Sequence, residues 1–367
     1  MIVTGIVLGV VAGFPVVVWA YMKLPQFGSK PTGERLARIQ ASPQYRDGAF
    51  QNQSDTPQFT DGGTFPKVMR RFFFEKNERK QPEAPIPAVK TDLHNLKPDE
   101  DVLIWMGHSS YYMQVDGKRI LVDPVLSGHA SPVSVSTRSF KGADVYSVAD
   151  IPETDYLIIT HDHYDHLDYK TVKALKSRVK KVITGLGTGA HLERWGYDSA
   201  MITEMDWHEE SMPDNGFTLT ATPARHFSGR SFKRNTTIWT SFVLQTPTHK
   251  IFIGGDSGYD SHFAETGKKY GPFDVAILEC GQYNQYWKHI HMMPEETVQA
   301  AQDLQAAKLL PVHWSKFALS LHDWDEPVKR VVAEAGRKDM PLILPVPGAP
   351  TYLKGVHENK KWWEQMS

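Results

Sequence analysis

Short runs of apolar and β-branched residues recur along the chain from residue 101 onward, and they predict a β-rich domain. The expected strands cover residues 102–106, 111–115, 119–123, 156–160, 182–184, 217–222, 237–245, 250–254 and 275–278. Asp116-Gly117 lies between two of these runs and is typical of a tight hairpin turn. Helices are expected at 169–180, 294–307 and 326–335, and the last two begin with proline and glutamate, as helix starts often do.

The order of these elements predicts the fold class. Many strands, with helices between them and late in each half, favour an α+β four-layer αββα sandwich, in which two stacked sheets are flanked by helices. We therefore expect three regions along the chain. Residues 1–23 are a transmembrane anchor or signal segment, residues 24–98 an extended arm that packs on the catalytic domain, and residues 99–367 the catalytic domain itself.

The N-terminal segment is apolar enough to meet a membrane. Residues 2–22 carry no charge over about the length needed to cross a bilayer. No lysine or arginine precedes this run, and several follow it, so the positive-inside rule predicts a membrane anchor with the catalytic domain on the cytoplasmic side. An export signal, which would make the protein periplasmic or secreted, is the first alternative, because Ala20 could end a cleavage site. A buried helix is the second.

The arm is rich in proline, glutamine, asparagine, serine and charged residues, with no sustained periodicity. Residues 67–74, with two arginines and three phenylalanines, form a short amphipathic piece. Basic and aromatic residues together suit a lipid interface. We favour the alternative, in which the arm places the three phenylalanines in the core.

Composition excludes some functions. The chain has 367 residues, 41% hydrophobic and 23% charged, and can bury a sizeable core. A net charge of −1 provides no field that would attract nucleic acid. The one cysteine, Cys280, excludes an internal disulfide framework, and its place at the end of an apolar run predicts a small buried thiol.

Three histidines and three carboxylates follow the predicted strand at 156–160 within nine residues. In an extended backbone His161 and His163 can face one ion, because side chains repeat with period two. Asp165 and His166 would then turn to a second ion nearby. Imidazole nitrogen and carboxylate oxygen are good ligands for divalent metals. A solvated polar loop is the alternative.

This His-x-His-x-Asp-His motif resembles the signature of the metallo-β-lactamase-fold hydrolases, and the likeness spans roughly residues 40–355. It implies that His226 completes the first metal site, that Asp256 bridges both ions and that His313 completes the second site. Residues 104–110, 122–124 and 291–296 are similar to the branch that contains N-acyl-phosphatidylethanolamine-hydrolysing phospholipase D. The implied metal ligands are His161, His163, Asp165, His166, His226, Asp256 and His313.

Two divalent ions sharing a water make hydroxide available near neutral pH, so no serine or cysteine nucleophile is needed. Zinc is the first expectation, and iron or manganese also suit ligands without thiolate. The resemblance implies that Asp165 and Asp256 take part in catalysis by binding the metals. His108 could orient a ligand or touch the substrate, and His291 could meet a phosphate or protonate a leaving group.

Other polar residues are expected to have supporting roles. Asp123, Asp162 and Asp168 are predicted to support the ligands, and His208 to be structural. No separate cofactor-binding residues are expected beyond the metal ligands.

The leading hypothesis is a membrane-associated, zinc-dependent phosphodiesterase of the N-acyl-phosphatidylethanolamine phospholipase D type, in which a metal-bridging hydroxide attacks phosphorus. Its partners would be a phospholipid or another phosphodiester substrate and the membrane, with no nucleic acid, and the oligomeric state stays open. A metal-dependent lactonase or acyl hydrolase of the same fold is the second hypothesis, since the same hydroxide attacks carbonyl carbon. The third is a non-catalytic, membrane-tethered binding protein.

Overall fold

Two mixed β-sheets form the centre of the computed structural model, which describes residues 14–75, 77–355, 357 and 359–366. The seven-stranded sheet has the order β15-β3-β4-β5-β6-β7-β8, and the six-stranded sheet the order β14-β13-β12-β11-β10-β9. The first comprises β3 (Val102–Trp105), β4 (Tyr111–Val115), β5 (Lys118–Val122), β6 (Thr154–Ile159), β7 (Val179–Gly185), β8 (Ile202–Met205) and β15 (Pro350–Tyr352). The second comprises β9 (Glu210–Asp214), β10 (Phe217–Thr222), β11 (Ser241–Gln245), β12 (Lys250–Ile253), β13 (Val275–Glu279) and β14 (Leu309–Val312).

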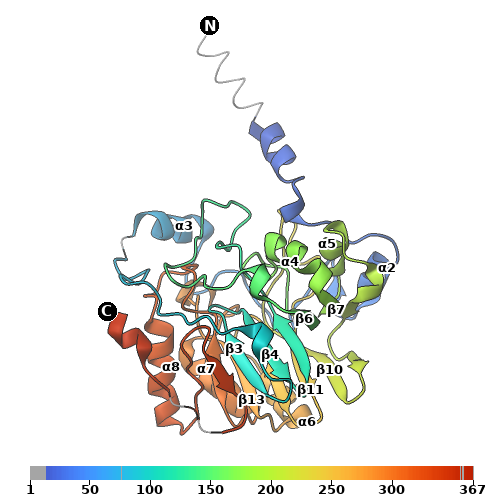
Figure 1. Cartoon of the computed structure of the whole chain (residues 1–367). Coiled ribbons are helices and arrows are strands. Elements are labelled where there is room, and N and C mark those ends of the chain that lie inside the picture. The colour runs from blue at the N-terminus through green and yellow to red at the C-terminus, as the bar shows by residue number, and fades with distance from the viewer. Residues whose placement is uncertain (1–13, 76, 356, 358, 367) are drawn as a thin grey trace.

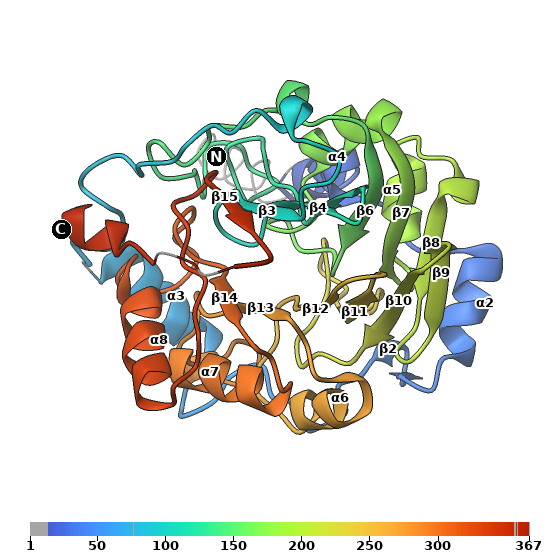
Figure 2. The same cartoon turned by 60° about the horizontal axis from the view of Figure 1, so that its bottom comes forward.

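Helices cover the outer faces of both sheets, so the domain has four layers (Figure 2). Helices α4 (Tyr169–Leu175) and α5 (Gly189–Arg194) pack on the seven-stranded sheet, because their leucines join its outer apolar cluster. Helices α6 (His262–Tyr270), α7 (Pro294–Asp303) and α8 (Glu326–Arg337) cover the six-stranded sheet. The αββα fold predicted from the sequence is confirmed.

The alternation of side chains along the strands decides which residues fill each layer. In β5, Ile120 and Val122 point to the core between the sheets, whereas Leu121 points to the outer cluster under the helices. Both faces of the central strands are buried, which explains why they read as continuous apolar runs. Burying one leucine or isoleucine side chain, compared with leaving it exposed, contributes roughly 1.5–3 kcal/mol to the free energy of folding.

The parallel strands direct the connecting loops to one end of the sandwich. β5, β6, β7 and β8 pair in parallel, and so do β12, β13 and β14. The chain therefore leaves β6, β12 and β14 on the same side, where open α/β sheets commonly place their chemistry. This geometry brings segments near residues 161, 256 and 313 together.

The predicted elements agree in most places with the structure. The strands 111–115 and 217–222 have the predicted bounds. The predicted helix at 169–180 ends at Leu175 in the structure. Val179 already begins β7, because Val179 and Val182 pack in the apolar cluster of the sheet. Residues 237–240 are not part of β11, since the N–H of Thr240 donates to the carbonyl of Thr160 instead. Strands β8, β9, β14 and β15 and helices α5 and α6 were not predicted.

The arm has more regular structure than the sequence indicates. It contains α2 (Gly33–Ala41), a small hairpin of β1 (Tyr45–Arg46) and β2 (Ala49–Phe50), and α3 (Phe65–Phe74). Ile39 and Phe50 are buried against the body. Phe74 is 80% exposed, so the prediction that three phenylalanines of this piece enter the core is wrong for that residue.

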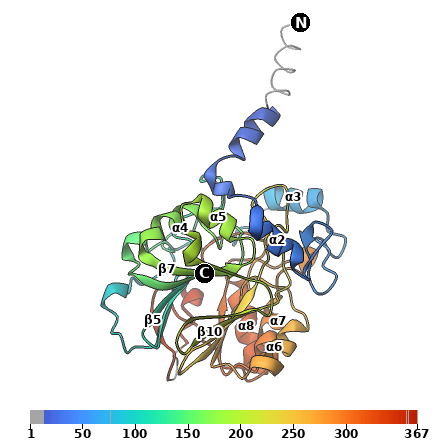
Figure 3. The same ribbon diagram turned by 90° about the vertical axis from the view of Figure 1, so that its right-hand side faces the viewer.

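Residues 14–21 form a helix that projects from the body of the protein (Figures 1 and 3). Phe14, Val16, Val17 and Trp19 on it are exposed. Residues 2–13 of the predicted membrane segment lie outside the described residues. Among the helices of residues 14–366 that the structure describes, none combines the length and the apolar character that crossing a membrane requires.

Candidate metal centre

The loop after β6 carries the first ligands, and hydrogen bonds hold it in shape. The N–H groups of His166 and Leu167 both donate to the carbonyl of His163, at 3.1 and 2.8 Å, which closes a tight turn. The buried Arg230 guanidinium donates to the carbonyls of Asp162 and Leu167 at 2.7 and 2.8 Å. Because the backbone is fixed at both ends of the turn, the intervening side chains have defined directions.

One group of donor atoms consists of His161, His163, His226 and Asp256. Nδ1 of His163 lies 3.0 Å from Nε2 of His161 and 3.2 Å from Nε2 of His226. Oδ2 of Asp256 lies 3.7 and 3.8 Å from the same two Nε2 atoms. The structure thus brings together the four residues expected at the first metal site.

A second group contains His108, Asp165, His166 and His313. Nε2 of His166 lies 3.6 Å from Oδ2 of Asp165 and 3.1 Å from Oδ2 of Asp256. Nδ1 of His313 lies 3.2 Å from Oδ1 of Asp256. Asp256 therefore contacts both groups, as a bridging carboxylate must.

These donors fit two divalent cations. Ligand nitrogens about 2.0–2.1 Å from a tetrahedral metal are about 3.3 Å from one another, and the separations given above bracket that value. Nε2 of His166, Nε2 of His313 and Oδ1 of Asp256 are buried and have no hydrogen-bond partner among the described residues. Such buried, unpaired polar atoms are costly unless something else binds them. They belong to residues whose donor atoms are clustered, so they are suited to bind a metal ion.

Burial acts to lower the pKa of His166, but the carboxylates of Asp256, Asp165 and Asp123 raise it, whereas the other shifts at the site agree with ligation. Burial lowers the pKa of His161, His226 and His313, which keeps these imidazoles neutral, the form that binds metal. Burial alone would raise the pKa of Asp256, but His166 and His313 outweigh it and lower that pKa well below its usual value. The carboxylate is thus charged.

His166, His226 and His313 each have one ring nitrogen that contacts a protein oxygen, which leaves the other nitrogen for an ion. Nδ1 of His166 bonds to the carboxylate of Asp123 at 2.8 Å, and Nδ1 of His226 donates to the carbonyl of Ile290 at 2.7 Å. Ser109 Oγ lies 2.9 Å from Nδ1 of His313.

His108, Asp123 and His313 have left-handed φ angles of 51°, 41° and 69°. Non-glycine residues rarely adopt this conformation, and it concentrates at functional sites.

The other predicted supporting carboxylates have different partners. Asp162 forms a hydrogen bond with His191 at 3.2 Å and accepts the N–H of Gly229 at 2.7 Å. It therefore stabilises the loop that carries the ligands, and neither partner is a ligand side chain. Asp168 caps α4 and accepts the N–H of Lys170. His208 is exposed in a turn, and its predicted structural role stays a prediction, whereas Cys280 is the buried free thiol expected from the sequence.

The two further histidine candidates differ in their access to substrate. His108 is fully buried, bonds through Nε2 to Asp165 at 2.9 Å and packs against the tilted ring of His313, with ring centroids 4.0 Å apart. This geometry favours support of ligands over contact with substrate. His291 lines the cavity above the site, beside Asp256 and His313.

A cavity of about 400 Å³ opens above the donor atoms. Its floor contains His163, Asp165, His226, Asp256, His291 and His313. Its walls are mainly apolar and come from four segments, with Phe59, Phe65, Val68, Met69, Phe227, Trp287, Ile290 and Leu319. Arg234 adds a cation to the lining; among the described residues its guanidinium has no ion-pair partner and no hydrogen bond, and it lies over the Phe227 ring.

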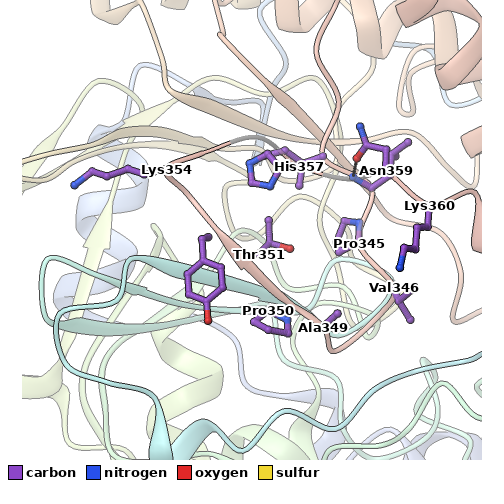
Figure 4. Close-up of a pocket in the computed structure, with 12 residues that line it drawn as sticks. Pro345, Val346, Ala349, Pro350, Thr351, Lys354, His357, Asn359 and Lys360 are labelled. Carbon is purple, nitrogen blue, oxygen red and sulfur yellow. Dashed lines mark hydrogen bonds between the residues drawn. The ribbon is translucent and has the colours of Figure 1, made fainter.

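Another cavity of about 410 Å³ lies at the C-terminal edge of the seven-stranded sheet (Figure 4). It is lined by residues between 343 and 360, including Lys354, His357 and Lys360. It contains none of the clustered donor residues. The two cavities have nearly equal volumes, so their chemistry and not their size identifies the functional one.

Three residues near the site were not singled out from the sequence. Asn52 of the arm pairs with the backbone of His226 through two hydrogen bonds of 2.8 and 3.0 Å. Glu279 bonds to His291, and Arg234 lines the cavity. Glu279 does end an apolar strand beside a predicted site segment, which is a weak local signal. Asn52 and Arg234 lie in polar loops and have no such signal.

Comparison with known proteins assigns the family. The Beta-lactamase superfamily domain matches residues 118–314. The chain is 38% identical to the uncharacterized protein Rv0906 of Mycobacterium tuberculosis over 88% of this chain and 87% of that protein. It is 27% identical to N-acyl-phosphatidylethanolamine-hydrolyzing phospholipase D 1 of Caenorhabditis elegans, over 83% of this chain and 90% of the relative.

Solved structures agree on the fold. Igni18, a metallo hydrolase of Ignicoccus hospitalis, superposes with a TM-score of 0.55 at 18% identity, over 70% of this chain and 99% of that one. Isothiocyanate hydrolase from Delia radicum gut bacteria gives a TM-score of 0.54 at 17% identity, over 68% of this chain and 98% of that one. The chain belongs to the β-lactamase superfamily and is a metallo-hydrolase of that superfamily.

Proposed function

We propose that this protein is a phosphodiesterase that hydrolyses N-acylated ethanolamine phospholipids at a membrane surface, with two divalent ions held by the seven ligand residues. The observation that carries the proposal is a cluster of metal-ligating side chains on the floor of a cavity with apolar walls. Cavities of this kind accept a ligand that is apolar over most of its surface and polar at one point. A phospholipid has this character.

The relatives support the choice of bond. The Caenorhabditis elegans relative and a mitochondrial one from Saccharomyces cerevisiae, 30% identical over 62% of this chain, are both described as N-acyl-phosphatidylethanolamine-hydrolyzing phospholipase D. Fold alone does not distinguish phosphodiester from lactone hydrolysis. The unpaired Arg234 in the cavity favours an anionic substrate, because a guanidinium binds phosphate oxygens by paired hydrogen bonds.

The residues of the chain have separable tasks in this reaction. When bound, two divalent ions supply Lewis acidity and ionise a water near neutral pH. Arg234 would bind a non-bridging phosphate oxygen, and the apolar walls would hold the acyl chains and exclude bulk water. The water oxygen bonds to phosphorus, the bond from phosphorus to the ethanolamine oxygen breaks, and a proton passes to that oxygen. The products are phosphatidic acid and the N-acylethanolamine.

Exposed apolar residues support membrane association. Helix α3 contributes a cavity wall and exposes Phe65 and Phe74, and the helix at 14–21 projects at the same end of the molecule in both views (Figures 1 and 3). Exposed aromatic residues beside lysines and arginines suit a lipid interface. Placement of the catalytic domain on the cytoplasmic side follows from the charges after residue 22 and is part of the proposal.

Substrate comparison tests the proposed function. We expect the full chain to hydrolyse a soluble bis-aryl phosphodiester and N-acyl-phosphatidylethanolamine in vesicles, with a lactone at least about 100-fold slower in kcat/KM, and to co-sediment with the vesicles. Faster hydrolysis of the lactone would identify an acyl hydrolase. A chain with bound metal that cleaves neither ester would support a binding protein. Failure to co-sediment would exclude the membrane role alone.

Substitution of Arg234 tests phosphate recognition. Arg234→Gln is expected to raise KM for the phosphodiester about 10-fold, equivalent to about 1.4 kcal/mol, and to change kcat little, because the contact is present in the ground state and the transition state alike. Arg234→Lys should recover only part of the affinity, since lysine lacks the planar pair of donors. The matched control is Lys233→Gln on the same exposed loop, which does not line the cavity. Equal kinetics in the Arg234→Gln and Lys233→Gln variants would contradict this role.

A further inference from the structure

A third cavity, of about 280 Å³, is lined by the segment that follows the projecting helix at 14–21 (Figure 1). It shares no lining residue with the cavity above the metal centre. The charged residues of this basic cavity are four cations and one carboxylate, namely Lys23, Lys30, Arg194, Arg230 and Asp162. The chain as a whole has a net charge of −1, so the cavity concentrates positive charge and is suited to an anion.

Hydrogen bonds fix the walls of the basic cavity. Arg194 of α5 donates to the carbonyl of Lys23 at 2.6 Å. Arg230 donates to the carbonyl of Gln26 through Nε at 3.1 Å and through Nη2 at 2.8 Å. The segment that enters the body from the helix is therefore held between α5 and the loop that carries Arg230. The shape of the cavity does not depend on a bound molecule.

The cations of this lining have no carboxylate partner among the described residues. Arg230 is 4% exposed, and all its hydrogen bonds go to backbone carbonyls. Lys23 and Lys30 are exposed, and within the described part of the chain neither forms an ion pair. Both carboxylate oxygens of Asp162 already accept other hydrogen bonds. Burying a guanidinium without a counterion is costly, and an anion in the cavity would offset that cost.

Two segments that line the cavity also have the character of a lipid-contacting surface. Residues 14–30 and 228–236 contain five lysines or arginines and no aspartate or glutamate. Trp19 of the projecting helix is 64% exposed and Phe232 is 85% exposed. Nζ of Lys23 lies 5.3 Å from the centroid of the Trp19 ring. Basic side chains beside exposed aromatic rings suit the headgroup region of a bilayer, where cations meet phosphate and rings enter the apolar boundary.

We propose that the basic cavity binds the phosphate group of an anionic membrane phospholipid while the projecting helix contacts the bilayer. Lysine and arginine bind phosphate oxygens through charge-assisted hydrogen bonds. Phosphatidic acid fits best, because a phosphate monoester carries about −1.5 to −2 at neutral pH whereas phosphatidylcholine has no net charge. The cavity is separate from the metal centre, so the lipid bound here is not the one that is hydrolysed. The membrane part of this inference rests on the proposed function, and the phosphate site does not.

Co-sedimentation of the full chain with two kinds of vesicle tests the site. One kind is pure phosphatidylcholine and the other a mixture of phosphatidylcholine and phosphatidic acid. We expect the parent to bind the mixed vesicles at least about 10-fold more tightly, and Lys23→Gln/Lys30→Gln to lose most of that preference, since each lysine near an anionic surface contributes about fivefold in affinity. The variant should keep the Tm of the parent, because neither ammonium group forms a hydrogen bond with a described residue.

The matched control is Lys268→Gln/Lys360→Gln, which removes the same charge from two exposed lysines outside the basic cavity. It should keep the preference for mixed vesicles. Equal losses in the control and in Lys23→Gln/Lys30→Gln would show that the charge of the whole protein attracts the vesicles, and would overturn the proposal. If the first double variant does not fold, Lys30→Glu alone provides the comparison and should weaken binding to mixed vesicles only.

A soluble probe distinguishes a lipid headgroup from a free phosphate ester. Calorimetric titration with glycerol phosphate should reveal a weak binding component in the parent that is lost in Lys23→Gln/Lys30→Gln, whereas binding at the metal centre is common to both proteins. Glycerol phosphate that binds as tightly as the mixed vesicles would identify a soluble ester as the ligand and overturn the membrane part. If the variant loses nothing in either experiment, the phosphate site is wrong.

The outcomes also separate this inference from the proposed function. A parent that hydrolyses N-acyl-phosphatidylethanolamine but does not prefer phosphatidic acid overturns the inference and leaves the proposed function intact. A parent that binds neither kind of vesicle contradicts the membrane role of the proposed function, and the glycerol phosphate titration still tests the basic cavity. Binding is measured without turnover, so a protein that hydrolyses no phospholipid can still confirm the phosphate site.

Discussion

Asp256→Asn is expected to abolish hydrolysis, with kcat reduced at least about 10³-fold. This exceeds the 10–100-fold expected for a residue that only hydrogen bonds to a metal ligand. The reason is that Asp256 lies against both donor groups: its Oδ2 lies 3.7 Å from Nε2 of His161 in the first group and 3.1 Å from Nε2 of His166 in the second. Asparagine keeps the shape but removes the negative charge that offsets the repulsion between two cations.

Elemental analysis of the same preparation is the measurement that accompanies the kinetics. The variant should bind at least one ion fewer per chain than the parent, and added metal should restore little activity. Asp303→Asn, a carboxylate of α7 outside the cavity, serves as the matched control and should keep both its metal and its activity. Full metal content together with unchanged kcat in Asp256→Asn would exclude a bridging role for this carboxylate.

Removal of metal by a chelator is expected to eliminate activity and to lower Tm. A ligand that binds only the folded state stabilises it by about 4 kcal/mol when present at a thousandfold excess over its Kd. For a chain of this size, that corresponds to a fall in Tm of roughly 5 °C on chelation. The buried atoms Nε2 of His166, Oδ1 of Asp256 and Nε2 of His313 explain the loss, because without a bound ion they have no hydrogen-bond partner among the described residues.

Zinc, manganese and iron are then added back singly to the chelated protein. We expect zinc to restore activity and Tm together, with elemental analysis of untreated protein identifying the same ion. Recovery with manganese or iron alone would correct the metal and keep the site. A chelated protein that retains its activity without bound metal would contradict the metal-dependent mechanism.

Local sequence features predicted much of the metal centre. His161, His163, Asp165 and His166 follow one apolar strand, and their order alone indicates two ligand groups. His226, Asp256 and His313 each lie just beyond a strand, and the family resemblance assigned them to the same site. The strand periodicity predicted the sandwich because buried strands have long apolar runs that are visible without any tertiary information.

The surroundings of the centre could not be predicted in this way. The predicted helix at 169–180 was too long by several residues, because Val179 enters the sheet, and strand β15 is recognisable only from its pairing with β3. The arm was expected to be extended, yet its helix α3 forms one wall of the cavity. Such short elements form through contacts with the body rather than through their own sequence preference.

The sequence by itself predicted the fold class and four candidate ligands, because these depend on periodicity and on a motif a few residues long, and its family resemblance added His226, Asp256 and His313. Only the tertiary structure decided that Asn52 holds His226 across 174 positions, that Glu279 bonds to His291 and that apolar residues surround the site. The physical reason is that a hydrogen-bond partner or a cavity wall is selected by packing in three dimensions. Residues distant in the chain carry no local mark of the neighbour that folding gives them.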